Sequence, residues 1–210
     1  MTIRLLIADD HEVVRSGLLS LMQGTDIEVI AEATTGHEAV RLARERKPDV
    51  ALIDIRMNGG DGLEALERIK ADRPDLPVLI LSTYDNPTYV ARAAALKASG
   101  YVLKGADREQ LLTSIRRAAA GETAWSPGDM RRVAGALSTA RVEGNIDAPL
   151  TKRESEVLRQ MAFGLSNKEI ALALQIGYET VKEHVQHILR KVGVTDRTQA
   201  AVWAVRNGLV

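Results

Sequence analysis

The sequence predicts an α/β protein with a doubly wound, five-stranded parallel sheet, followed by an all-α domain of four helices. Two observations lead to this prediction. Up to about residue 121, short apolar runs alternate with amphipathic stretches, and the connections between them are only a few residues long. From residue 150 onward only helical patterns remain, so the second part of the chain belongs to another fold class.

The five apolar runs are the predicted strands. They cover residues 3–8, 27–33, 50–53, 78–81 and 101–103. The helical patterns that alternate with them cover residues 12–22, 37–46, 62–72, 87–98 and 107–120. Capping signals open several of these helices: Thr35 with Glu38, Asp107 with Gln110, and Asn86 before Pro87. Each local signal agrees with the α/β pattern.

The alternation stops after residue 121, which we take as the end of a first domain covering 1–121. Residues 122–149 are rich in Gly, Pro, Ser and Thr, and predict a linker that contains a short helix at 130–137. The second domain covers 150–210. Two capping-box spacings open its first helices: Thr151 with Glu154, and Ser166 with Glu169.

Composition excludes several classes of protein. The 210 residues are 45% hydrophobic and 27% charged, as in ordinary globular proteins. No apolar stretch approaches the roughly 18 residues of a membrane span, and the N-terminus turns acidic too early for a secretory signal. The absence of cysteine excludes disulfides and thiolate metal sites, and fits the cytoplasm. Residues 150–210 carry nine Lys or Arg against six acids, which hints at nucleic acid.

Polar side chains stand at or just beyond the carboxyl ends of four predicted strands. They are Asp9, Asp10, Asp54, Ser82, Thr83 and Lys104. The carboxyl ends of parallel strands meet at one edge of a sheet, so these side chains are expected to converge. Three carboxylates together repel one another, and a hard divalent cation with oxygen ligands relieves that repulsion. A carboxylate beside such a cation can attack phosphorus, so the pattern predicts a phosphorylation site.

Each residue alone has an ordinary structural explanation: a loop capped by acids, a polar strand exit or a solvated lysine. Their joint occurrence at four strand ends favours a shared role in a phosphorylation site. A cation between Asp10 and Asp54 would offset phosphoryl charge, and Lys104 would add a second positive charge. The Ser82 hydroxyl could donate a hydrogen bond to the new phosphoryl group.

The motifs IADDH, LIDIRMNGGDG, LILSTYDN and GYVLKGA resemble, in order and spacing, those of bacterial response-regulator receiver domains with a flavodoxin-like fold. The resemblance implies phosphorylation at Asp54, with Mg²⁺ held by Asp10, Asp54 and the backbone carbonyl of Arg56, and with Asp9 assisting through water. It also implies that Tyr101 is an aromatic switch residue. An aromatic ring lying on the sheet is an equally good explanation of Tyr101.

Two positions depart from the receiver pattern. Asn58 stands where receivers usually have proline, which predicts a more flexible loop beside the phosphoacceptor. Gly105 follows the lysine where many receivers have proline. Neither change removes a ligand from the predicted site.

The helical pattern over 177–192 has one apolar face, formed by Tyr178, Val181, Val185, Ile188 and Val192. The opposite face is centred on Glu179, Glu183, Gln186 and Arg190, with Lys182 at its flank. Such side chains could read base edges in a major groove. A solvated outer face is the simpler explanation for this helix alone, but it is the second of two helices joined by a short turn.

Residues 150–210 resemble the LuxR-type helix-turn-helix domain over nearly their whole length. The resemblance implies a scaffold helix at 166–174, a recognition helix at 178–192 and a dimerisation helix at 197–206. The implied DNA-binding positions are Lys168, Thr180, Lys182, Glu183, Gln186, Arg190 and Lys191. Glu183 and Gln186 stand where the family often has an apolar and a basic residue, so we expect a distinct base preference and a shallow salt dependence.

Together these features predict a transcription regulator of the NarL/FixJ type, switched by phosphorylation of Asp54. The expected partners are double-stranded DNA, a sensor histidine kinase and a second copy of the chain, with RNA polymerase a further candidate and no membrane. A constitutive DNA-binding protein with an interaction-only receiver is the main alternative. A phosphohydrolase is a second, but Arg56 stands where such enzymes commonly place an acid/base aspartate.

Overall fold

The computed structural model describes residues 2–57, 60–83, 85–139 and 149–210. They form two compact units. The first comprises Met1–Asp85 and Leu96–Ser126, and the second Asn86–Ala95 and Pro127–Val210. The prediction that an α/β part is followed by an all-helical part is confirmed. No helix within the described ranges is long and apolar enough to cross a membrane.

The first unit is built on the five predicted strands. These are β1 (Ile3–Ala8), β2 (Ile27–Ala33), β3 (Val50–Asp54), β6 (Val78–Ser82) and β7 (Gly100–Leu103). All neighbouring pairs are parallel, and the order across the sheet is β2-β1-β3-β6-β7. The chain changes its direction of winding between β1 and β3. A ligand crevice is therefore expected beyond the carboxyl ends of these two strands.

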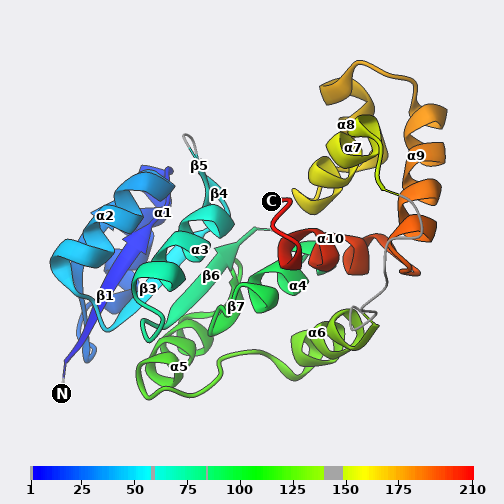
Figure 1. Cartoon of the computed structure of the whole chain (residues 1–210). Helices are drawn as coiled ribbons and strands as arrows, with labels where there is room; N and C mark the ends of the chain where they lie inside the picture. Colours follow the sequence, from blue (N-terminus) through cyan, green and yellow to red (C-terminus); the bar gives the residue numbers. More distant parts are fainter. Residues whose placement is uncertain (1, 58–59, 84, 140–148) are drawn as a thin grey trace. The chain divides into compact units, whose positions relative to one another are not determined.

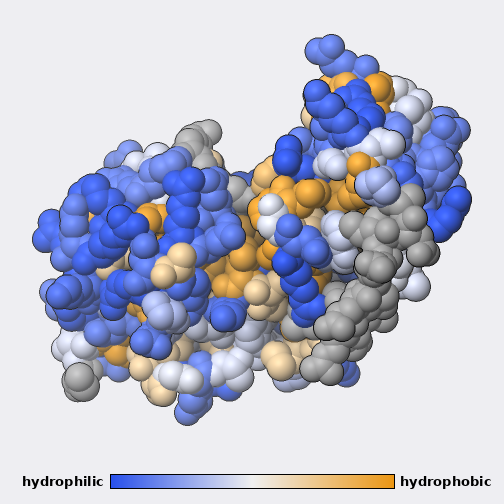
Figure 2. All heavy atoms as spheres, in the orientation of Figure 1, coloured by the Kyte–Doolittle hydropathy of each residue, from blue (hydrophilic) through white to orange (hydrophobic). Residues whose placement is uncertain are grey.

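Helices cover both faces of this sheet (Figure 1). They are α1 (Glu12–Met22), α2 (Gly36–Arg46), α3 (Gly62–Asp72) and α5 (Arg108–Ala119). Leu5 and Ile7 of β1 share an apolar cluster with Leu18 of α1 and Ile115 of α5. Leu6 is fully buried outside that cluster, since successive side chains of a strand point to opposite faces. The surface over α2 and α3 is mostly hydrophilic on the face shown in Figure 2.

The predicted capping residues at four helix starts form N-cap hydrogen bonds. The Thr35 side chain accepts a hydrogen bond from the Glu38 amide, and the Asp107 side chain accepts one from the Gln110 amide. In the second unit both predicted capping boxes are complete: Thr151 with Glu154, and Ser166 with Glu169. Caps of this kind typically stabilise a helix by about 1 kcal/mol each.

A short antiparallel hairpin between β3 and α3 was not predicted. It consists of β4 (Arg56–Met57) and β5 (Gly60–Asp61), with Arg56 opposite Asp61. Two-residue strands carry too little periodicity to be recognised in a sequence. Asn58 stands where receivers usually have proline, and a flexible loop was expected there. This residue lies outside the described residues.

The second unit is helical. It contains α4 (Pro87–Ala95), α6 (Pro127–Thr139), α7 (Lys152–Ala162), α8 (Asn167–Leu174), α9 (Tyr178–Lys191) and α10 (Arg197–Arg206). Fully buried side chains from α7, α8, α9 and α10 form its core, among them Leu158, Ile170, Val181, Ile188 and Ala200. Helix α6 is longer than the predicted 130–137 helix, and residues 140–148 of the predicted linker lie outside the described residues.

Helix α4 packs with the second unit, although the sequence pattern places it among the β/α repeats. The Arg92 guanidinium is buried and donates to the Ala162 carbonyl at 2.7 Å, and the Tyr89 hydroxyl donates to the Phe163 carbonyl at 3.1 Å. Both carbonyls belong to the C-terminal end of α7, where main-chain acceptors lack partners within the helix. A local pattern cannot reveal such a long-range pairing.

Candidate phosphorylation site and nucleic-acid interface

The structure brings four of the predicted site residues together at the carboxyl edge of the sheet. Asp9 and Asp10 follow β1 directly, and Asp54 ends β3, the neighbouring strand. The ammonium group of Lys104, which follows β7, lies 2.7 Å from Asp9 Oδ2 and 3.0 Å from Asp54 Oδ2. Asp9 is fully buried and Asp54 is 4% exposed. The convergence predicted from the strand ends is therefore present.

Burial and ion pairing shift the pKa values of two groups in this cluster, Asp54 and Lys104. Burial raises the pKa of Asp54, since a carboxylate loses its hydration, and pairing with Lys104 only partly opposes that rise. Burial alone would lower the pKa of Lys104, but its hydrogen bonds to Asp9 and Asp54 outweigh this effect and raise it. The cluster holds three carboxyl groups, and the Lys104 ammonium group pairs with two of them, so a cation can offset the remaining negative charge.

The donor set fits a hard divalent cation. One ligand atom from each of Asp9, Asp10, His11 and Asp54 lies within 4.8 Å of the others, and three of these four atoms are carboxylate oxygens. Magnesium prefers such oxygen ligands and commonly binds through one or two carboxylates. Arg56, whose backbone carbonyl is the further expected ligand, lies in β4, directly beyond β3 and residue 55.

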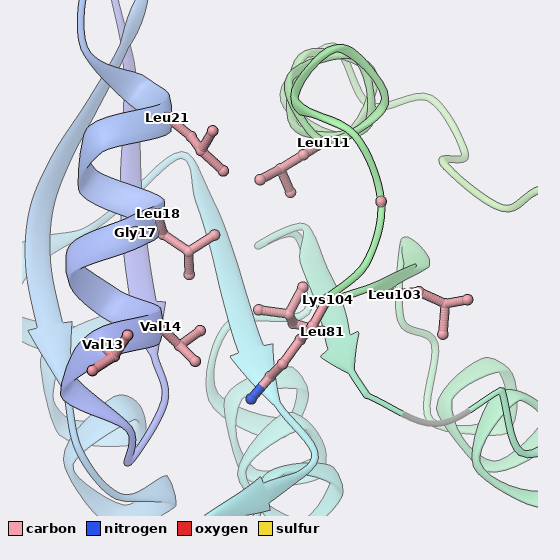
Figure 3. A pocket seen from close by; sticks show the side chains of 10 residues that line it. Val13, Val14, Gly17, Leu18, Leu21, Leu81, Leu103, Lys104 and Leu111 are labelled. Carbon is pink, nitrogen blue, oxygen red and sulfur yellow. The ribbon is translucent and has the colours of Figure 1, made fainter.

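Lys104 also lines an apolar groove between α1 and α5. Figure 3 shows its side chain beside Leu81, with Leu18 of α1 and Leu111 of α5 on the groove walls. Lys104 thus lines this apolar groove, while its ammonium group reaches the carboxylates. The ion pairs with Asp9 and Asp54 hold the ammonium group of Lys104 at the acidic site.

The predicted switch residues lie on or beside two neighbouring strands: Ser82 on β6, Thr83 directly after it and Tyr101 on β7. Ser82 is buried at the end of β6, one residue beyond Leu81, which pairs in register with Asp54. Thr83 is exposed. Tyr101 lies on β7 opposite Ile80, and it is 6% exposed. The hydroxyl group nearest in register to Asp54 thus comes from Ser82.

Three residues at the site were not identified from the sequence. His11 Nδ1 lies 2.7 Å from Asp10 Oδ1, and the Arg15 guanidinium donates to the Asp9 carbonyl at 2.8 Å. Gly62 begins α3 directly against the Asp54 backbone. His11 adjoins the acid pair, which is a signal that could have been used. Arg15 and Gly62 carry no comparable signal because their roles depend on the packed backbone.

The predicted recognition helix is α9, and the scaffold helix before it is α8. Gln175 ends α8 in the left-handed conformation, and Gly177 is the N-cap of α9, so the turn between them is short. Six of the seven predicted DNA-binding positions are exposed: Lys168, Thr180, Lys182, Glu183, Gln186 and Arg190. The Lys182 ammonium lies 3.0 Å from Glu179 Oε2 on the preceding turn.

Lys191 differs from the other six positions. It is partly buried, and its ammonium group lies 2.7 Å from Oε2 of Glu154, whose side chain is itself buried. This pairing lowers the pKa of Glu154 although burial alone would raise it. A role for Lys191 in phosphate binding stays a prediction, while its intramolecular role is to neutralise Glu154.

The apolar face of α9 was predicted correctly except at one end. Val181 and Ile188 are fully buried, Val192 is buried just after the helix, and Val185 packs against the same core. Tyr178 is instead 45% exposed, and its ring lies beneath the Lys182 ammonium at 5.9 Å. As the first residue of α9 it extends beyond the core that the later turns contact.

Comparisons with known proteins agree with both halves of this description. Residues 5–116 match the response regulator receiver domain, and residues 148–204 match the luxR family of bacterial regulatory proteins. The uncharacterized transcriptional regulatory protein YxjL of Bacillus subtilis is 40% identical over 99% of this chain and 97% of its own length. Response regulator protein VraR of Staphylococcus aureus is 38% identical over the full length of both chains.

A solved structure aligns with the whole chain. The crystal structure of the response regulator ChrA, from a heme-sensing two-component system, is 35% identical, with a TM-score of 0.54 over 100% of this chain and 99% of that one. A receiver joined to a LuxR-type domain is the organisation of two-component transcription regulators, and it does not favour a constitutive DNA-binding protein. The chain therefore belongs to the response regulator family whose members combine a receiver domain with a LuxR-family DNA-binding domain.

Proposed function

We propose that Asp54 accepts a phosphoryl group from a sensor histidine kinase and that this event controls DNA binding by the second domain. The observation that supports this most directly is the Lys104 ammonium between Asp9 and Asp54, at 2.7 and 3.0 Å, with Asp10 adjoining. This arrangement combines a nucleophile, a positive charge and a cation-binding set in one place. We also propose domain boundaries at residues 121 and 149.

In the proposed reaction a carboxylate oxygen of Asp54 forms a bond to phosphorus as the bond from phosphorus to the donor nitrogen breaks. Lys104 stays beside the new phosphoryl oxygens and neutralises part of their charge. The Ser82 hydroxyl turns toward the phosphoryl group and donates a hydrogen bond. Asp9, Asp10, Asp54 and the Arg56 carbonyl would hold Mg²⁺, which when bound offsets phosphoryl charge.

We propose that the protein does not turn over external phosphoesters. Phosphoryl-transfer enzymes with an aspartate nucleophile commonly need a second carboxyl group two residues later as acid/base, and this chain has Arg56 there. The outcome of phosphorylation is instead a population shift toward a dimeric form that places two recognition helices on DNA. Such a regulator works in the cytoplasm, which contains the DNA and the phosphorylated histidine of the kinase.

The first test is phosphorylation of the intact chain. Incubation with acetyl phosphate and Mg²⁺ is expected to add the mass of one phosphoryl group to the wild type and nothing to Asp54→Asn. The control is Asp75→Asn, which removes an exposed carboxylate and should leave the adduct unchanged. Genomic fragments selected by the protein should bind more tightly after phosphorylation. An Asp54→Asn protein that still gains the adduct would refute the assignment.

A second test addresses the DNA interface. Replacing Lys182 with alanine is expected to weaken binding to a selected genomic fragment by about 1 to 3 kcal/mol, the range of one good side-chain contact to a base edge. Glu179→Gln should strengthen binding to the same fragment, since it removes a negative charge and releases Lys182 from its ion pair at 3.0 Å. Fluorescence anisotropy against labelled DNA measures both.

The matched control is Lys152→Ala, which removes an exposed lysine from α7 in the same domain. It should change affinity far less than Lys182→Ala does. Equal losses from the two variants would mean that α9 contributes only its general charge, and would contradict its role as a reader of sequence.

A further inference from the structure

We propose that His11 is a nitrogen ligand of the acidic site and that it gives the site a higher affinity for transition-metal dications, such as Ni²⁺, than its oxygen ligands alone would supply. The inference rests on the proposed metal-assisted phosphorylation of Asp54. It goes beyond that function because the resemblance to receivers implies only oxygen ligands.

The first argument is the position of the imidazole. His11 Nδ1 lies 2.7 Å from Asp10 Oδ1 and 3.4 Å from Asp9 Oδ1. Two neighbouring ligand atoms on one octahedral ion lie about 3 Å apart when each metal–ligand bond is about 2.1 Å long. Both separations are close to that value. Nδ1 can therefore share an ion with these two carboxylates with small movements.

The second argument is what the His11 side chain does not do. His11 is the N-cap of α1, a position that favours Ser, Thr, Asp and Asn because their side chains accept amide hydrogen bonds. Its side chain makes no capping hydrogen bond. Its backbone amide instead donates to Asp9 Oδ1 at 2.9 Å, which fixes the residue beside the acids. The residue is thus held at the cluster while its ring stays available to it.

Burial supports the same assignment. Asp9 and Asp54 form the buried side of the cluster, whereas the His11 side chain is 67% exposed. The imidazole therefore lies on the side where solvent has access to the site. An exposed side chain is free to turn toward an incoming ion while it stays beside Asp10.

The chemistry of the ring selects the class of ion. Imidazole nitrogen suits zinc, copper, iron and nickel, and dication affinity for mixed nitrogen and oxygen sites rises along the first transition row from manganese. Magnesium is harder, prefers oxygen and keeps several waters. His11 should therefore add affinity for the transition metals and little for Mg²⁺.

The test uses Mn²⁺ as the probe on the full chain. Pulsed electron paramagnetic resonance should detect coupling of the bound Mn²⁺ to a ¹⁴N nucleus in the wild type and lose it in His11→Asn. Affinity for Ni²⁺, an ion that suits imidazole nitrogen, should fall about tenfold in His11→Asn. Affinity for Mg²⁺ should change less than about threefold, since Mg²⁺ favours oxygen ligands. His37→Asn, on the exposed side of α2, is the control and should keep the ¹⁴N signal.

The outcomes separate this inference from the proposed function. Mn²⁺ that binds the wild type, is weakened by Asp10→Asn, and shows no ¹⁴N coupling would overturn the role of His11 alone. His11 would then be only a hydrogen-bond partner of Asp10. Absence of any Mn²⁺ or Mg²⁺ binding that depends on Asp10 would overturn the metal site, and the inference with it.

Discussion

Replacing Gly62 with alanine is expected to destabilise the receiver by about 3 kcal/mol or more and to prevent phosphorylation of Asp54. A Cβ atom at this position would lie 1.9 Å from the Asp54 carbonyl oxygen, 2.8 Å from its carbonyl carbon and 3.0 Å from Ile55 Cα. All three are backbone atoms, and Asp54 and Ile55 are buried. No flexible side chain can yield, so either α3 or the end of β3 must move.

Gly17→Ala is the matched control for this substitution. Gly17 lies in α1, is exposed, and a Cβ there would meet no atom within 4 Å. Alanine should stabilise this helix by about 0.5 to 1 kcal/mol because it lowers the backbone entropy of the unfolded chain. Thermal unfolding and the acetyl phosphate adduct measure both variants. A Gly62→Ala protein with wild-type melting and a normal adduct would show that the two backbones are not in close contact.

The second large effect is expected from Asp54→Asn, which should stabilise the receiver at pH 7 in the absence of metal. We expect a gain of roughly 1 to 2 kcal/mol, within the usual range for single substitutions. The neutral amide removes one of three clustered carboxylates at a buried position. Lys104 keeps its ion pair with Asp9 at 2.7 Å, so the substitution leaves no buried ammonium group without a partner.

The pH dependence of this gain has a definite sign. Burial raises the pKa of Asp54 in the folded state above its ordinary value of 3.8. Between the pKa of Asp54 in the unfolded chain and its higher pKa in the folded protein, the folded protein binds more protons than the unfolded one. The wild type therefore loses stability as the pH rises through this window. The advantage of Asp54→Asn should therefore shrink as the pH falls from 7 toward 4, because Asp54 itself becomes neutral.

Chemical denaturation at several pH values, without metal, measures this difference. Asp75→Asn, at an exposed position, is the control and should stay within about 0.5 kcal/mol of the wild type throughout. Added Mg²⁺ should stabilise the wild type more than Asp54→Asn, since a ligand stabilises the form that binds it. An Asp54→Asn protein less stable than the wild type at pH 7 would contradict the account of the cluster.

Much of this protein could be predicted from local patterns in its sequence. Apolar runs of three to seven residues identified all five strands of the sheet, and spacings of three residues identified the capping boxes at Thr151 and Ser166. The acidic site was predictable for a related reason. In a parallel sheet every strand ends at the same edge, so Asp9, Asp54 and Lys104 had to converge once the strands were known.

The sequence by itself determined the kinds of element, their order and the residue types at the sheet edge, because periodicity and capping act over a few residues. Only the tertiary structure decided which groups touch across long separations. It set the Gly62 backbone against Asp54, paired Lys191 with Glu154, and joined Arg92 of α4 to the end of α7. These contacts depend on how folded elements pack, and short-range patterns carry no record of that packing.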